Sequence, residues 1–153
     1  MRNLRTIGLA AFKNNGKLTE ENFEDFAPGL EELSLVSANI VKIDKKAFAH
    51  IPSVSSMDLS NNKISYIDNE AFKEVGNALK SLKMSNALYF TTLPNLAFHS
   101  LSAMITLDLS DNHVREIPLD SFHKMSKLKF LYLQVRLSLY NNHYSIAMIC
   151  ICS

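Results

Sequence analysis

Cysteine is nearly missing from this chain, since it occurs only as Cys150 and Cys152. Residues 1–149 therefore carry no disulfide framework. Glycine and proline are scarce too, with four of each, so that no flexible linker of the usual composition divides the chain. Lysine plus arginine number 16 and aspartate plus glutamate 15. This balance argues against nucleic acid or an anionic membrane as the main partner, because both attract proteins with a clear basic excess.

Long hydrophobic runs are also absent. No stretch reaches the roughly 18 consecutive apolar residues that a membrane-spanning helix requires, so the sequence predicts no transmembrane segment. The opening stretch MRNLRTIGLAAFKNNGK has only a short apolar run with no small-residue cleavage site after it, and it does not predict a signal peptide. No N-x-[ST] sequon occurs, so glycosylation gives no indication of the compartment.

Patterns that carry catalysis or metal binding are lacking as well. There is no G-x-S-x-G, no glycine-rich phosphate loop and no paired cysteine and histidine within the body of the chain. Cys150 and Cys152 form a lone C-x-C without two further ligands nearby. None of the histidines has a second ligand at i, i+4 spacing, and we expect them in solvated surface loops: His50, His99, His113, His123 and His143. The sequence predicts no enzyme activity, no cofactor and no metal site.

The chain does contain a repeat of about 25 residues. SSMDLSNNKISYIDNEAF (55–72) returns 50 residues later as ITLDLSDNHVREIPLDSF (105–122), and half of that period recovers further copies. A weaker copy begins at Leu4. The clear units follow one another in steps of 24, 25, 25 and 24 residues, beginning at Leu30, Val54, Leu79, Met104 and Leu128.

Each unit has apolar residues at positions 1, 4 and 6, most have them again at positions 11 and 14, and each full unit ends on a phenylalanine. Alternation at positions 4 and 6 predicts a short strand with one buried face. One unit cannot enclose a core, whereas stacked units cover one another's apolar edges. We therefore predict a right-handed solenoid in which MDLS (57–60), LKM (82–84) and LDLS (107–110) share one parallel sheet. Four phenylalanines are predicted to be buried and stacked on the opposite, convex side: Phe48, Phe72, Phe98 and Phe122.

The pattern LxxLxLxxNxIxxIxxxAF resembles the leucine-rich repeat, in the 24-residue form typical of animal extracellular proteins. The stretch VGNALKSLKMSNAL (75–88) also resembles chaoptin-like adhesion proteins of insects and arachnids. The resemblance implies an α/β solenoid with its parallel sheet on the concave side and loops and 3-10 turns on the convex side. It divides the chain into an irregular N-terminal repeat (1–29), four full repeats with the start of a fifth (30–133), and a non-repeat tail (134–153).

In this family, an asparagine at position 9 hydrogen-bonds backbone groups of adjacent turns. Asn62 and Asn112 stand at that position, whereas Ala38 and Ala87 occupy it in the alternate turns. The asparagine ladder is therefore expected to be interrupted, and one extra residue in the third unit predicts a bulge around YFTTLP (89–94). Two asparagines displaced by one position are candidate substitutes in the alanine turns: Asn39 and Asn86.

Side chains at positions 3, 5, 7 and 8 are expected to leave the sheet on its concave face. The alternating charges of Asp58, Lys83 and Asp108 indicate either cross-strand pairing or a protein-binding stripe. Phe130 and Tyr132 favour a binding role, because aromatic residues are enriched in interface hot spots; alternatively, they are exposed because the pattern stops soon after them. The candidate binding face consists of Glu32, Ser34, Ser56, Asp58, Ser81, Lys83, Thr106, Asp108, Phe130 and Tyr132.

The missing chemistry and the resemblance together predict a protein-binding module from a cell-surface adhesion ectodomain. The alternative is part of a ligand-binding signalling or innate-immune receptor. The predicted partner is a protein of unknown identity, not a nucleic acid. An extracellular or cell-surface location for the parent protein rests on the resemblance alone.

The repeat pattern stops after Leu133. Solenoids need caps over their terminal turns, and neither end shows the Cys-rich cap that the resemblance implies for an extracellular member of the family. The tail (134–153) is interpreted either as the product of an incomplete gene model or truncated transcript, or as an improvised C-terminal cap. We therefore expect the chain to be an internal part of a longer protein. Residues 136–153 are expected to be poorly packed. Uncapped ends also predict self-association, because exposed apolar edges with open strand backbones recruit other chains.

Overall fold

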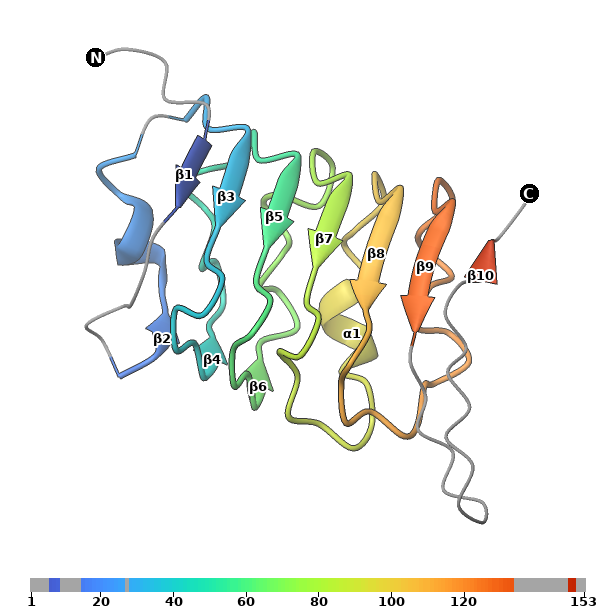
Figure 1. Ribbon diagram of the computed structural model, residues 1–153. Coiled ribbons are helices and arrows are strands. Elements are labelled where there is room, and N and C mark those ends of the chain that lie inside the picture. The colour runs from blue at the N-terminus through green and yellow to red at the C-terminus, as the bar shows by residue number, and fades with distance from the viewer. Residues whose placement is uncertain (1–5, 9–14, 27, 134–148, 151–153) are drawn as a thin grey trace.

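The computed structural model describes residues 6–8, 15–26, 28–133 and 149–150, and shows a solenoid whose turns stack side by side (Figure 1). One edge of every turn contributes a strand to a seven-stranded sheet of order β1-β3-β5-β7-β8-β9-β10. The predicted parallel-sheet solenoid is confirmed. Its strands are β1 (Thr6–Gly8), β3 (Glu32–Ser34), β5 (Ser56–Asp58), β7 (Ser81–Lys83), β8 (Thr106–Leu109), β9 (Phe130–Leu133) and β10 (Ile149–Cys150).

The sheet register follows the apolar residue at position 4 of each repeat. All pairs from β1 to β9 are parallel, and the pairing places one buried side chain per strand in a single row: Leu33, Met57, Leu82, Leu107 and Leu131. A slip of one residue would turn this row out to solvent, so burial fixes the register. The strands predicted in 57–60, 82–84 and 107–110 are confirmed as β5, β7 and β8.

A second, smaller parallel sheet was not predicted from the sequence. It has the order β2-β4-β6, with β2 (Lys17–Leu18), β4 (Lys42–Ile43) and β6 (Tyr66–Ile67). Leu18, Ile43 and Ile67 are buried and in register. In the next turn Tyr89 is 54% exposed. Regular pairing gives way there to isolated bridges from Ile64 to Leu88 and from Thr92 to Glu116. The bulge expected at 89–94 stays a prediction.

Helical structure in the described residues is limited to two short segments outside the large sheet. These are the 3-10 turn η1 (Glu20–Phe23) and the single α-helical turn α1 (Asn95–Phe98). The rest of the convex side consists of turns and loops. No helix in the described part of the chain is long and apolar enough to cross a membrane.

Stacked phenylalanine rings fill the convex side of the core. Ring centroids lie 5.9 Å apart from Phe23 to Phe48, 5.5 Å from Phe48 to Phe72 and 6.2 Å from Phe72 to Phe98. All four side chains are fully buried. Phe122 differs from the prediction, because it is only partly buried against this core. It belongs to the last full described turn, and no described phenylalanine covers its outer side.

Asn62 and Asn112 are buried and hydrogen-bonded to the backbone of two turns each. The Asn62 side-chain amide donates to the carbonyl oxygens of Leu35 and Leu59 at 2.9 and 2.7 Å, and its Oδ1 accepts the Ile40 N–H at 2.9 Å. Asn112 donates to the carbonyls of Met84 and Leu109 and accepts the N–H groups of Ala87 and Leu88. Both asparagines therefore reach back into a turn that has alanine at position 9.

The expectation that Asn39 and Asn86 substitute for the missing ladder members is wrong. Both are exposed and have positive φ angles of 59° and 50°, and Asn86 donates its side-chain amide to the Oδ1 of Asn61 at the surface. Ala38 and Ala87 are buried where the ladder would continue. Backbone groups of these two turns bond instead to the asparagine of the next turn.

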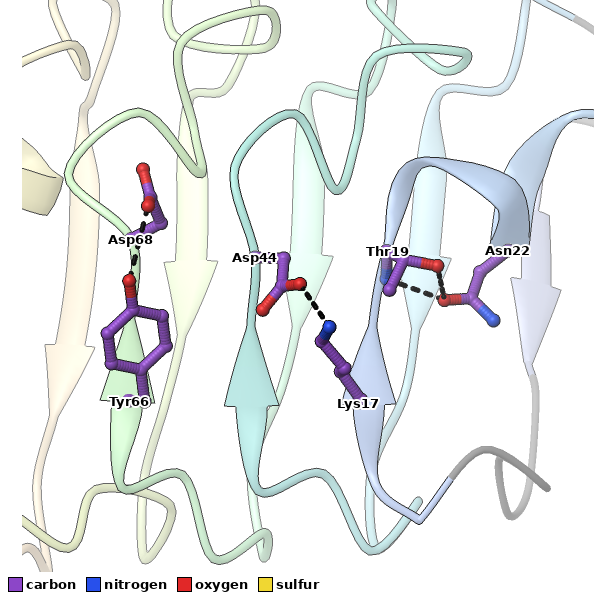
Figure 2. Close-up of polar contacts among 6 residues, drawn as sticks. All are labelled: Lys17, Thr19, Asn22, Asp44, Tyr66 and Asp68. Atoms are coloured by element: carbon purple, nitrogen blue, oxygen red, sulfur yellow. Dashed lines mark hydrogen bonds and ion pairs between the residues drawn. The ribbon is translucent and has the colours of Figure 1, made fainter.

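Polar contacts lie along the edge of the smaller sheet, and the one between Lys17 and Asp44 joins successive turns (Figure 2). Lys17 Nζ lies 2.7 Å from Asp44 Oδ2, and the hydrogen bond to this carboxylate raises the pKa of Lys17. The Tyr66 hydroxyl donates to Asp68 at 3.2 Å, which raises the pKa of Tyr66. Asn22 accepts hydrogen bonds from the N–H and hydroxyl of Thr19 at the start of η1. Such exposed pairs add little stability and mainly set local geometry.

Little of the tail lies within the described residues. Two of its residues form β10, which pairs antiparallel with β9 through Ile149 with Leu131 and Cys150 with Phe130 (Figure 1). The outer edge of β9 is therefore partly occupied, where the sequence led us to expect an open edge. The packing expected of residues 136–153 falls otherwise outside the described part, and self-association through the ends stays a prediction.

Replacing Phe72 by alanine should lower the free energy of unfolding by about 3–5 kcal/mol, the usual cost of deleting a core phenylalanine. Phe122→Ala should cost clearly less, because its ring is only partly buried. Urea unfolding monitored by circular dichroism measures both. Equal losses for the two variants, or a Phe72→Ala loss below about 1 kcal/mol, would contradict the stacked column.

Candidate functional site

The candidate binding face consists of two rows of side chains that cross the large sheet. Strand pairing aligns the position-3 residues Glu32, Ser56, Ser81, Thr106 and Phe130 in one row. It aligns the position-5 residues in the other: Ser34, Asp58, Lys83, Asp108 and Tyr132. All ten side chains are exposed or half-buried. The structure thus brings together on one face all ten residues that the sequence selected.

A shallow hollow opens at one end of this face because the residues between its charged groups are small. It encloses about 170 Å³. The small side chains of Ser34 and Ser56 line it together with three charged ones, Glu32, Asp58 and Lys83. The hollow therefore offers carboxylate, hydroxyl and ammonium groups together, which suits polar side chains of a partner rather than a large apolar group.

The carboxylates of the alternating charge column accept hydrogen bonds from serines that follow their own strands. Asp58 Oδ1 accepts the Ser60 N–H at 3.0 Å. Asp108 Oδ1 accepts both the N–H and the hydroxyl of Ser110, at 3.0 and 2.6 Å. Such bonds to the residue two positions on are typical of aspartate where a strand gives way to a turn. The two acids are thereby positioned by local turns.

Lys83 lies between these acids without pairing with either. Across the ranges that the structure describes, no ion pair within 4.0 Å joins its ammonium group to Asp58 or Asp108. Its side chain is exposed. The strand register places Lys83 opposite both aspartates, but no close ion pair forms. The lysine presents its charge to solvent instead.

Below the two rows, the position-8 residues adopt the left-handed backbone conformation. Their φ angles lie between 50° and 57°, and all four are exposed: Ser37, Asn61, Asn86 and Asp111. Asparagine and aspartate tolerate this conformation better than most residues. Sequence reasoning placed position 8 on the face but did not predict its positive φ angles. The asparagine and aspartate residues at this position could have indicated them.

Aromatic side chains stand at the end of the face near the tail. Phe130 is 41% exposed and Tyr132 is half-buried. The neighbouring edge of β9 is paired with β10 at Phe130 itself. Phe130 is thus exposed although its strand is paired on that edge, and a binding role for Phe130 and Tyr132 stays a prediction.

Sequence reasoning missed a cluster of metal-ligand side chains on the convex side. His99, Asp120 and His123 each place one potential ligand atom within 4.8 Å of those of the other two. His99 and His123 are 24 residues apart, one repeat period. That spacing was the signal, because a solenoid brings residues one period apart into contact.

Comparison with known proteins decides the family. The leucine rich repeat model matches residues 28–86 and 77–135, well over half of the chain. The chain belongs to the leucine-rich repeat family. The resemblance seen in the repeat pattern is thereby confirmed, and this fold typically serves as a binding module without catalytic activity.

Individual relatives match about two thirds of this chain. Chaoptin of Drosophila melanogaster is 37% identical over 94 residues, which are 61% of this chain and 7% of chaoptin. Leucine-rich repeat-containing protein 3 of Danio rerio is 33% identical over 67% of this chain and 42% of its own. Human Toll-like receptor 5 is 32% identical over 67% of this chain and 12% of the receptor. The chain thus spans less than half of each relative.

Solved structures show the same fold. The structure of the Toll–Spatzle complex, from Drosophila, superposes with a TM-score of 0.66 and 20% identity over 76% of this chain and 15% of that chain. Human trophoblast glycoprotein superposes with a TM-score of 0.56 and 21% identity over 85% of this chain and 60% of that chain. At these identities the likeness concerns the solenoid alone.

Lys83→Ala should leave the free energy of unfolding unchanged within about 0.5 kcal/mol, because the exposed lysine pairs with neither aspartate. Asp108→Ala should cost about 1 kcal/mol, because Ser110 loses its acceptor. In the double variant the two effects should add, as measured by urea unfolding. A coupling energy above about 0.5 kcal/mol would show that Lys83 and Asp108 are paired after all.

Proposed function

We propose that this leucine-rich repeat solenoid is a protein-binding module of a cell-surface adhesion ectodomain, and that the concave face holds the partner. The observation that carries the proposal is the set of functional groups on that face which the fold does not use. Lys83 presents an unpaired charge, and Phe130 presents an exposed ring. Charged groups fix the orientation of a partner and speed its association, while aromatic side chains supply binding free energy.

The adhesion assignment is supported by the sequence identity to Drosophila chaoptin over 94 aligned residues. We infer a similar function from this similarity. An extracellular or cell-surface parent protein is part of the same proposal. The partner is a folded protein, because the two rows form a broad polar surface with one shallow hollow instead of a deep pocket. Broad faces with a few anchoring residues are typical of protein interfaces.

A second candidate is a ligand-binding receptor. It is favoured by the likeness to human Toll-like receptor 5 and by the structure of Toll bound to Spatzle. Both candidates use the concave face in the same way and differ in what the parent protein carries beyond it. Sequencing the flanking transcript separates them: a lipid-anchor signal supports adhesion, and a membrane helix followed by an intracellular signalling domain supports the receptor.

The binding face is tested with the full chain immobilised against a panel of purified cell-surface ectodomains. For a partner found in this way, Lys83→Glu and Phe130→Ala should each weaken the dissociation constant at least about 10-fold, which corresponds to about 1.4 kcal/mol. The matched controls are Lys124→Glu and Leu119→Ala, exposed residues outside the large sheet. Surface plasmon resonance gives the constants. Equal losses in the control and concave variants would place the interface elsewhere.

A further inference from the structure

A cluster of two histidines and one aspartate lies on the convex side, away from the proposed binding face. His99 directly follows α1, while Asp120 and His123 flank Phe122 in the next turn. The two imidazole rings meet edge to face, with centroids 4.9 Å apart and an interplanar angle of 88°. Stacking of successive turns holds the three side chains together.

The Nε2 atom of His99 is buried and has no hydrogen-bond partner. Its nearest acidic neighbour is Asp120 Oδ2 at 3.6 Å, which is too long for a hydrogen bond. A buried polar atom without a partner is costly and uncommon in folded proteins. A ligand that accepts the lone pair of this nitrogen would remove the cost.

Hydrogen bonds already hold the other two side chains by their remaining polar atoms. His123 Nδ1 lies 2.5 Å from the backbone carbonyl oxygen of Asp120. Since a carbonyl can only accept, Nδ1 carries the proton and the Nε2 lone pair is free. Asp120 Oδ1 accepts the side-chain amide of Asn95 at 2.8 Å, which leaves Oδ2 available. Bonds of this kind orient the ligands of metal ions in proteins.

We propose that His99, Asp120 and His123 bind a divalent transition metal ion of the zinc class, with solvent completing a tetrahedral site. Two imidazoles and one carboxylate suit zinc, whereas calcium and magnesium prefer sites made of oxygen ligands. Zinc–nitrogen bonds of about 2.0–2.1 Å place tetrahedral ligands about 3.3 Å apart. One potential ligand atom of each residue lies within 4.8 Å of those of the other two, and small side-chain rotations of the exposed Asp120 and His123 that keep their hydrogen bonds close the difference.

Such an ion would join the third and fourth turns on the side opposite the sheet. It bridges α1 to the loop around Phe122, where the phenylalanine column is only partly covered. Its role is therefore structural, since it adds a cross-link between adjacent turns. The site uses no residue of the concave face, so it stands or falls independently of the proposed function.

The test is titration of the full chain with zinc chloride by isothermal calorimetry. Thiolates bind zinc on their own. The parent chain of this test and every variant therefore carry Cys150→Ser and Cys152→Ser, and the unaltered chain is titrated beside them. We expect one zinc ion per chain and no heat with magnesium or calcium chloride. His99→Gln and His123→Gln should each weaken binding more than about 10-fold. Asn95→Ala should weaken it about 10-fold, as does the loss of groups that orient metal ligands.

His113→Gln is the matched control, since this exposed histidine belongs to the same turn as Asp120 but lies against Tyr89. It should bind zinc like the parent chain. Zinc should also raise the melting temperature of the parent chain and of His113→Gln, but not that of His123→Gln, by mass action. Circular dichroism confirms that the variants fold alike. The site is overturned if zinc binding disappears with the two cysteines, or if His113→Gln weakens it as much as His99→Gln and His123→Gln do.

Discussion

Hydrogen bonding of buried backbone groups in the loops after the sheet strands is the constraint on which the solenoid depends. These loops are irregular and buried, so their N–H and C=O groups cannot all find partners in a strand ladder or in water. Asn62 and Asn112 satisfy groups of their own turn and of the turn before it. The small Ala38 and Ala87 stand where those preceding turns would otherwise place a polar side chain. Four turns are thereby held by two asparagines.

This arrangement leaves the side chains at positions 3 and 5 of the concave face outside the core. Inward positions 4 and 6 are fully committed to the core, and the position-9 asparagines hold the loops. At position 5, Lys83 joins no ion pair among the described residues, and the side-chain carboxylates of Asp58 and Asp108 accept hydrogen bonds from their own turns. A solenoid of this kind can therefore vary the outward side chains of its sheet without disturbing its core.

The sequence sufficed for the large sheet and for most of the core, because periodic apolar residues state directly which side chains are buried. It did not reveal β2, β4 and β6, since two residues are too few to show alternation. Asn39 and Asn86 were misjudged because a backbone with positive φ turns their side chains to solvent. Phe72 and Phe122 occupy the same repeat position, but the ring of Phe72 is covered by Phe98 of the next turn, whereas the ring of Phe122 is only partly buried. Strand alternation predicted which ten residues lie on the face. That Lys83 forms no close ion pair could be seen only from the side-chain positions in the structure.

The reach of each asparagine into the preceding turn is tested most directly by amide hydrogen exchange, followed by NMR. The N–H groups of Ala87 and Leu88, which bond to Asn112, and that of Ile40, which bonds to Asn62, should exchange slowly in the parent chain. In Asn112→Ala, exchange at Ala87 and Leu88 should accelerate about 10-fold more than at Ile40, because only their acceptor is lost. Unchanged protection of Ala87 and Leu88, or an equal loss at all three amides, would contradict the account.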